Sequence, residues 1–195
     1  MKSKQTSADY YDRLYARADW TLEASPQLPL YNFIAERIEP TAAVLDIACG
    51  SGLLAERLSH KGVLRVVGVD FSSVAIERAT KRCPWATFLC GSLPGGLSSV
   101  LRQYTPSVAV LVEALEHLVE DRATLEALPQ GIRVLLTVPS FDDEGHVRTF
   151  PTKASVLARY ADLVRFDHVE QLGMWWAAEG IRHSASLAQL RDQKT

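Results

Sequence analysis

Apolar residues recur along the chain in short, nearly continuous runs that alternate with longer stretches of helical periodicity. Continuous runs rich in Val, Ile and Leu are typical of strands covered on both faces, as in a parallel sheet. The stretches between them repeat apolar residues every three or four positions, which predicts helices. We therefore expect an α/β fold. The predicted strands are 43–48, 65–71, 86–90, 107–113 and 132–138, and the predicted helices between them are 53–60, 73–82, 97–104 and 121–128.

The two ends of the chain add elements to this pattern. An amphipathic helix is predicted at 31–38, ahead of the first strand. A polar loop at 140–152 follows the fifth strand, and a helix is predicted near 153–163. Two apolar segments, 166–172 and 174–181, are separated by a single glycine and predict an antiparallel hairpin at the edge of the sheet.

The length of 195 residues suits one domain of ordinary size, spanning 1–195, with a core at 41–183 and a polar tail at 184–195. The net charge of −2 offers no general attraction to a phosphate backbone, so nucleic-acid binding is not favoured. No apolar run reaches the roughly 18 residues that span a bilayer, and the first residues lack the apolar segment of a secretion signal. We expect a cytoplasmic protein without membrane contact. The sequence does not indicate an oligomeric state.

The number and spacing of the cysteines argue against two kinds of structural cross-link, a disulfide framework and a zinc site. Cys49, Cys83 and Cys90 make an odd number without the C-x-x-C spacing of a metal site. Neither a disulfide framework nor a zinc site is therefore expected.

The most informative motif is the run VLDIACGSG at 44–52, which is followed by Asp70 at the end of the next apolar run. A strand that ends in a glycine turn before a helix lets backbone N–H groups approach a ligand closely, because glycine has no Cβ and tolerates positive φ. Asp70 then lies where the next parallel strand ends, placed to accept hydrogen bonds from a ribose. The spacing fits neither a P-loop, which needs a Lys followed by Ser or Thr, nor a G-x-G-x-x-G dinucleotide site.

This motif is similar to motif I of class I S-adenosylmethionine-dependent methyltransferases, and the resemblance extends over 43–140. It implies a Rossmann-like sheet of seven mostly parallel strands, with helices on both faces and a C-terminal antiparallel hairpin. It also implies S-adenosylmethionine as the cofactor. In this family the first acid, here Asp46, reaches the methionine part of the cofactor, Gly50 and Gly52 pass beneath it, and Asp70 holds the ribose.

The resemblance extends to other parts of the site. Relatives often carry an adenine-binding acid after the third strand, where this chain has Gly91-Ser92-Leu93 and no acid. The segment 10–17 resembles a helix that folds over the cofactor, so 1–40 is expected to cover the cofactor or substrate. The full set of expected cofactor residues is Tyr15, Asp46, Ala48, Cys49, Gly50, Gly52, Asp70, Phe71, Gly91, Ser92, Leu93 and Glu113.

A second cluster of chemical groups follows the fourth strand. If the chain turns helical there, Glu113, Glu116 and His117 share one helix face. A plain helix start with acids near its positive end explains the same residues. The segment also resembles the E-x-x-E-H variant of motif IV, which lies beside the transferred methyl. That resemblance makes His117 and Glu116 the candidate catalytic residues, with His117 as a general base of near-neutral pKa.

A metal site is an alternative interpretation of this cluster. Glu113, Glu116 and His117 together with His146 would supply two oxygen and two nitrogen ligands, and small-RNA 3′-terminal 2′-O-methyltransferases resemble this arrangement. The chain departs from that group because it lacks a second histidine-rich stretch, a basic charge and an RNA-binding companion domain. We therefore predict no metal.

Three functions follow from these patterns. The first is a methyltransferase that acts on an oxygen or nitrogen of a small-molecule acceptor. The alternatives are the metal-dependent RNA enzyme and a noncatalytic cofactor-binding partner subunit. The acceptor pocket is expected from the N-terminal segment, the 140–152 loop and the last hairpin. Trp175 and Trp176 alternate faces on that hairpin, which suggests that one packs inside and the other borders the substrate entrance, with core packing favoured for either of them.

Overall fold

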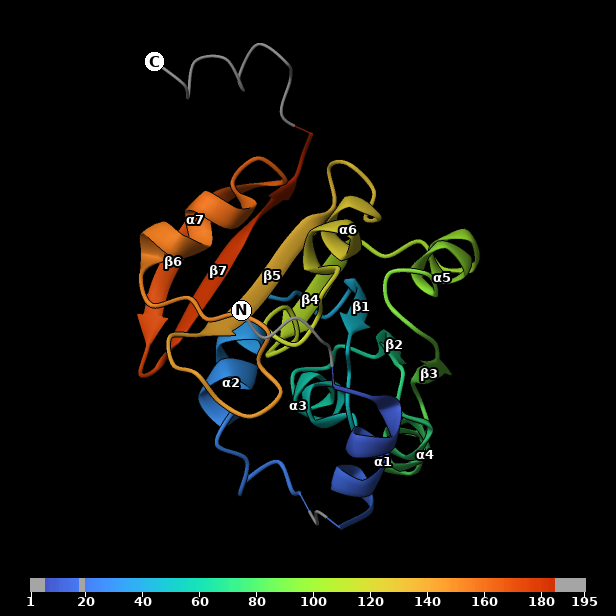
Figure 1. The fold of residues 1–195 in the computed structure, drawn as a ribbon. Helices are drawn as coiled ribbons and strands as arrows, with labels where there is room; N and C mark the ends of the chain where they lie inside the picture. The colour runs from blue at the N-terminus through green and yellow to red at the C-terminus, as the bar shows by residue number, and fades with distance from the viewer. Residues whose placement is uncertain (1–5, 18–19, 185–195) are drawn as a thin grey trace, which may run out of the picture.

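The computed structural model describes residues 6–17 and 20–184, which form one seven-stranded sheet with helices on both sides (Figure 1). The strand order is β3-β2-β1-β4-β5-β7-β6, and only β7 runs against the other strands. This topology confirms the expected fold class, including the C-terminal hairpin. The strands are β1 Ala43–Ile47, β2 Arg65–Asp70, β3 Thr87–Cys90, β4 Val108–Val112, β5 Arg133–Pro139, β6 Val164–Leu172 and β7 Trp175–Arg182.

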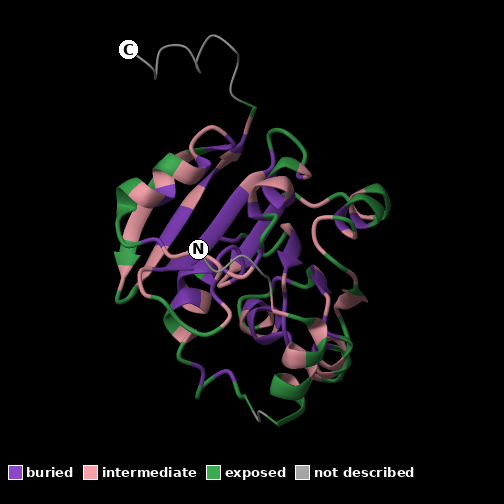
Figure 2. Ribbon diagram, viewed as in Figure 1, coloured by how far each residue is buried: buried purple, intermediate pink, exposed green. Residues whose placement is uncertain are grey.

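The helices cover the sheet in two layers. Neighbouring β1 residues alternate between them: Val44 packs in the cluster of α2 and α3, and Leu45 packs in the cluster of α5, α6 and α7. Both faces of the central strands are therefore buried (Figure 2). The helices are α1 Ala8–Arg17, α2 Leu28–Glu36, α3 Leu53–Ser59, α4 Ser73–Arg82, α5 Leu97–Gln103, α6 Asp121–Glu126 and α7 Lys153–Tyr160.

Element ends differ from the sequence prediction in places. Helix α2 begins at Leu28 rather than at residue 31, because Pro29 lies in the first turn, where its missing N–H costs nothing. The predicted polar tail lies outside the described residues after Ser184. None of the helices that the structure describes is both long and apolar enough to cross a membrane.

The helix that would place Glu113 and His117 on one face does not form, because the segment consists of turns. Glu113 has a φ of 51°, in the left-handed region, and its N–H donates to the Thr137 carbonyl of β5. The Arg148 guanidinium donates to the carbonyls of Leu115 and Leu118. These contacts occupy backbone groups that a helix would pair internally.

Candidate functional site

A cavity of about 680 Å³ opens at the carboxyl ends of the parallel strands. The residues after β1, β2, β3 and β4 all contribute to its lining, because parallel strands end at the same edge of the sheet. Helix α1, the loop after β5 and the β6–β7 hairpin complete the walls. The volume lies in the range of about 300–1,000 Å³ typical of small-ligand pockets.

The loop between β1 and α3 is built from backbone in the left-handed region. Ala48, Gly50 and Gly52 have φ values of 60°, 52° and 80°. A Cβ on Gly50 would lie 2.6 Å from the Tyr15 hydroxyl oxygen, so α1 closes directly over this glycine. A side chain at either glycine would be strained and crowded, which explains the glycines at these positions.

Asp70 ties this loop to the turn after β2. Its Oδ2 accepts a hydrogen bond from the Gly50 N–H at 2.9 Å, and its Oδ1 accepts one from the Ser72 N–H at 2.9 Å. Burial raises the pKa of Asp70, and the two N–H donors oppose that rise. This organising role was missed by sequence reasoning, which assigned Asp70 only a ribose contact.

Asp46 is buried beside Asp70 with an unsatisfied oxygen. The residue is 2% exposed, and its Oδ2 has no hydrogen-bond partner among the residues that the structure describes. Burial, and secondarily the Asp70 charge, raises the pKa of Asp46 to about 7. A buried carboxylate without a donor is costly unless a ligand supplies one. The methionine ammonium of the cofactor has the required chemistry, so this position fits the group that the resemblance implies.

The expected cofactor residues divide between the cavity and its support. Gly52 and Gly91 do not line the cavity: Gly52 lies against Ala79 of α4, and the Gly91 N–H donates to the Asp70 carbonyl. No acidic side chain follows β3 in the lining. The other expected residues are wall residues, namely Tyr15, Asp46, Ala48, Cys49, Gly50, Asp70, Phe71, Ser92, Leu93 and Glu113.

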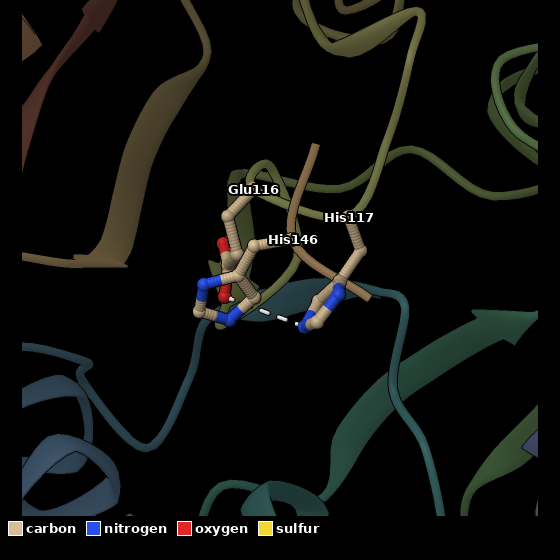
Figure 3. A group of neighbouring side chains, drawn as sticks. All are labelled: Glu116, His117 and His146. Atoms are coloured by element: carbon tan, nitrogen blue, oxygen red, sulfur yellow. Dashed lines mark ion pairs between the residues drawn. The ribbon is translucent and has the colours of Figure 1, made fainter. Parts of the chain in front are cut away.

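Glu116, His117 and His146 come together beside this cavity (Figure 3). One ligand atom from each lies within 4.8 Å of the others, and Glu116 Oε1 is 3.7 Å from His117 Nε2. Glu116 is fully buried, and neither carboxyl oxygen hydrogen-bonds to another described side chain or backbone group. Burial, reinforced by Glu113, raises the pKa of Glu116 well above its ordinary value. Burial therefore favours the protonated form of Glu116.

His117 is held through its Nδ1. This atom lies 3.0 Å from the Tyr11 hydroxyl oxygen and 3.2 Å from the Gly145 carbonyl oxygen. The Gly145 carbonyl can only accept, so it favours the tautomer with the proton on Nδ1 and the lone pair on Nε2, whereas the Tyr11 hydroxyl can donate or accept. Burial lowers the pKa of His117 to about 4, against the opposing effect of the Gly145 carbonyl. The near-neutral pKa expected from the sequence is therefore wrong, and His117 is uncharged at pH 7.

Glu113 does not complete a four-ligand metal set with the cluster of Glu116, His117 and His146. Its Oε2 accepts a hydrogen bond from Trp175 Nε1 at 2.6 Å, and its Oε1 lies 3.5 Å from Thr137 Oγ1. Burial raises the pKa of Glu113 to about 8, against these two donors. Three groups could still hold a metal ion, but the set of two carboxylates and two imidazoles suggested by the sequence is not formed.

The wall also contains residues to which no sequence motif assigned a specific role. Tyr11 reaches His117, and Phe141 lies edge-on to Trp175 with ring centroids 6.0 Å apart. Trp175 lines the cavity, whereas Trp176 packs on the core and donates to the Phe150 carbonyl. The two tryptophans thus face different surroundings, and the core packing favoured for either of them holds for Trp176 and not for Trp175.

Comparisons with known proteins agree with this architecture. Residues 44–137 match the family described as "Methyltransferase domain". The chain is 33% identical over 92 residues to a ribosomal protein L11 methyltransferase of Methylobacillus flagellatus, covering 40% of this chain and 31% of that protein. It is 36% identical over 103 residues to a mitochondrial ubiquinone biosynthesis O-methyltransferase of Schizosaccharomyces pombe, covering 49% of this chain and 37% of that protein. The chain thus spans about a third of the length of these curated relatives.

The fold is also found in solved structures. A TehB-like SAM-dependent methyltransferase from Corynebacterium glutamicum superposes with a TM-score of 0.61 at 18% identity, covering 90% of this chain and 98% of that chain. The sheet, the glycine loop and the matched region define a class of nucleoside-cofactor enzymes. The matched region, residues 44–137, is a methyltransferase domain of the class I type, whose cofactor is S-adenosylmethionine.

Proposed function

We propose that this chain transfers the methyl group of S-adenosylmethionine to an oxygen or nitrogen atom of a small-molecule acceptor. The observation that carries the proposal is one cavity that contains both the unsatisfied Asp46 carboxyl and the His117 imidazole. Asp46 offers a partner for the cationic end of the cofactor, and His117 offers a lone pair for the proton of the acceptor. Helix α1 serves as a cover, because Tyr15 lies over Gly50.

In this proposal, the bound cofactor supplies an electrophilic methyl group on a sulfonium. Transfer of that methyl group to the acceptor oxygen or nitrogen would leave the electron pair of the carbon–sulfur bond on sulfur. His117 Nε2 takes the acceptor proton, and Tyr11 and the Gly145 carbonyl hold the ring through Nδ1. The cavity walls hold donor and acceptor close together, which supplies much of the acceleration in such a displacement.

A second candidate is metal-assisted methylation of an RNA 2′-hydroxyl. The cluster of Glu116, His117 and His146 favours it, because these residues could bind one divalent ion. Two observations weigh against it. Glu113 is engaged by Trp175, and the described lining of the cavity contains neither lysine nor arginine to bind phosphate.

Cofactor binding and turnover are the direct tests. Calorimetry with S-adenosylhomocysteine is expected to give one-to-one binding to the unmutated chain. An acceptor panel of phenols and amines, read out as S-adenosylhomocysteine formation from S-adenosylmethionine, then tests transfer. Absence of binding to the unmutated chain would refute the proposed function. Binding without turnover on any acceptor would favour the noncatalytic partner subunit.

A further inference from the structure

The acceptor wall is the part of the cavity formed by Tyr10, Tyr11, Phe141, Glu144, Trp175 and the side chain of Glu113. Its rings are arranged by edge contacts: Tyr10 meets Tyr11 with centroids 5.4 Å apart, and Phe141 meets Trp175 at 6.0 Å. The wall adjoins the base, since the Tyr11 ring also lies edge-on to His117 at 5.9 Å. A molecule that presents its nucleophile to His117 therefore packs against aromatic side chains.

The charges around this wall have one sign. Glu144 lies in the acceptor wall and Asp143 lines the same cavity, whereas burial raises the pKa of Glu113 to about 8 and leaves it mostly uncharged at pH 7. No lysine or arginine is found among the described residues that line the cavity. The nearby Arg148 does not reach the acceptor wall as a cationic donor, because its guanidinium hydrogen-bonds to three backbone carbonyls and forms an ion pair with Asp121 at 3.3 Å. A carboxylate or phosphate placed here would lose its water without gaining a cationic donor, which is costly.

We infer that the acceptor is an aromatic molecule without an anionic group, and that an amine-bearing aromatic is preferred. This inference rests on the proposed function. The rings supply stacking and edge contacts to a planar acceptor, and their faces attract a cation. The Glu144 carboxylate adds a favourable field for a positive charge and repels a negative one. The acceptor wall thus selects by shape and by charge together.

Three phenols that differ in their terminal group test the inference on the protein loaded with S-adenosylhomocysteine. Tyramine carries an ammonium, 4-ethylphenol carries no charge, and 3-(4-hydroxyphenyl)propionate carries a carboxylate. Calorimetry or ligand-observed NMR is expected to show tyramine binding at least about tenfold more tightly than the propionate, with 4-ethylphenol between them. Equal or tighter binding of the propionate would overturn the inference, and so would failure of all three to bind at millimolar concentration.

Matched variants assign the charge preference to the acceptor wall. Glu144→Gln is expected to narrow the ratio of tyramine to propionate affinity by about two- to fivefold, since Glu144 is exposed and partly screened. The control Glu39→Gln changes an exposed acid that does not line the cavity, and it should leave the ratio unchanged. Equal changes in both variants would overturn the assignment. Failure of S-adenosylhomocysteine to bind would count against the proposed function instead, so the two failures are distinguishable.

Discussion

Replacing Asp46 by Asn should stabilise the ligand-free protein while weakening cofactor binding. The pKa of Asp46 rises from an ordinary 3.8 to about 7 because the carboxyl is buried. A raised pKa means that folding favours the protonated form. The contribution of Asp46 to stability is therefore highest at low pH and is lost as the pH rises from about 4 to about 7. The asparagine side chain carries no charge at any pH, so the variant avoids this loss.

The magnitude of this gain follows from the difference between the two pKa values. At about 1.4 kcal/mol per pKa unit, ionising Asp46 in the folded protein costs up to about 4 kcal/mol above pH 7. The buried asparagine amide offsets part of the gain, since an unpaired polar group costs about 1–3 kcal/mol. We expect a net stabilisation of about 1–3 kcal/mol at pH 8. The stability difference between variant and wild type should rise by about 2–3 kcal/mol from pH 5 to pH 8.

Urea unfolding at pH 5, 6, 7 and 8 without cofactor measures this difference. Asp167→Asn is a suitable control, because that side chain is 55% exposed on β6 and does not line the cavity. A stability difference for Asp46→Asn that stays constant with pH would refute the reasoning. In the same variant, calorimetry should show S-adenosylhomocysteine affinity reduced by about 1.5–3 kcal/mol, as expected for loss of a charged acceptor.

Three further predictions concern the other site residues. Asp70→Ala removes the acceptor for two backbone N–H groups, so it should weaken S-adenosylhomocysteine binding by about 1.5–3 kcal/mol in calorimetry; unchanged affinity would contradict its organising role. Turnover should survive treatment with EDTA. If EDTA instead removes the activity, Mn²⁺ restores it and His146→Ala also removes it, the metal-dependent enzyme would be favoured. His117→Ala should lower kcat by about 10²–10⁴ while cofactor affinity is retained. If the variant keeps most of its kcat, the rate acceleration comes from holding donor and acceptor close together and not from a general base. Because the pKa of His117 is about 4 and the neutral ring is the active form, the wild-type rate should be constant between pH 6 and pH 8 and fall only as the pH approaches 4.

Local patterns were sufficient to predict the sheet and the cofactor loop. The apolar runs of β1, β4 and β5 correspond to strands because these strands are buried on both faces, and that burial leaves a signature in consecutive residues. The positive-φ loop at Gly50 and Gly52 was likewise readable, since glycine marks such backbone.

Contacts between distant residues account for what the sequence did not predict. The turn at Glu113 depends on Thr137 of β5, and the turns that follow it depend on Arg148. The low pKa of His117 depends on its burial, to which Tyr11 and the Gly145 loop contribute. None of these partners lies within a window in which periodicity or spacing carries information.

The attachment of α1 differs in kind from that of α2. None of its residues is buried, and polar contacts hold it to the rest of the site: Tyr11 to His117, Asp12 to Ser72, and the Ala16 carbonyl to Arg78. Helix α2, in contrast, buries four apolar or aromatic side chains. Local unfolding of α1 removes no fully buried side chain from the core and so costs less free energy than unfolding of α2. We therefore expect its amide hydrogens to exchange with solvent much faster than those of α2, and ligands to reach the cavity by detachment of this one helix.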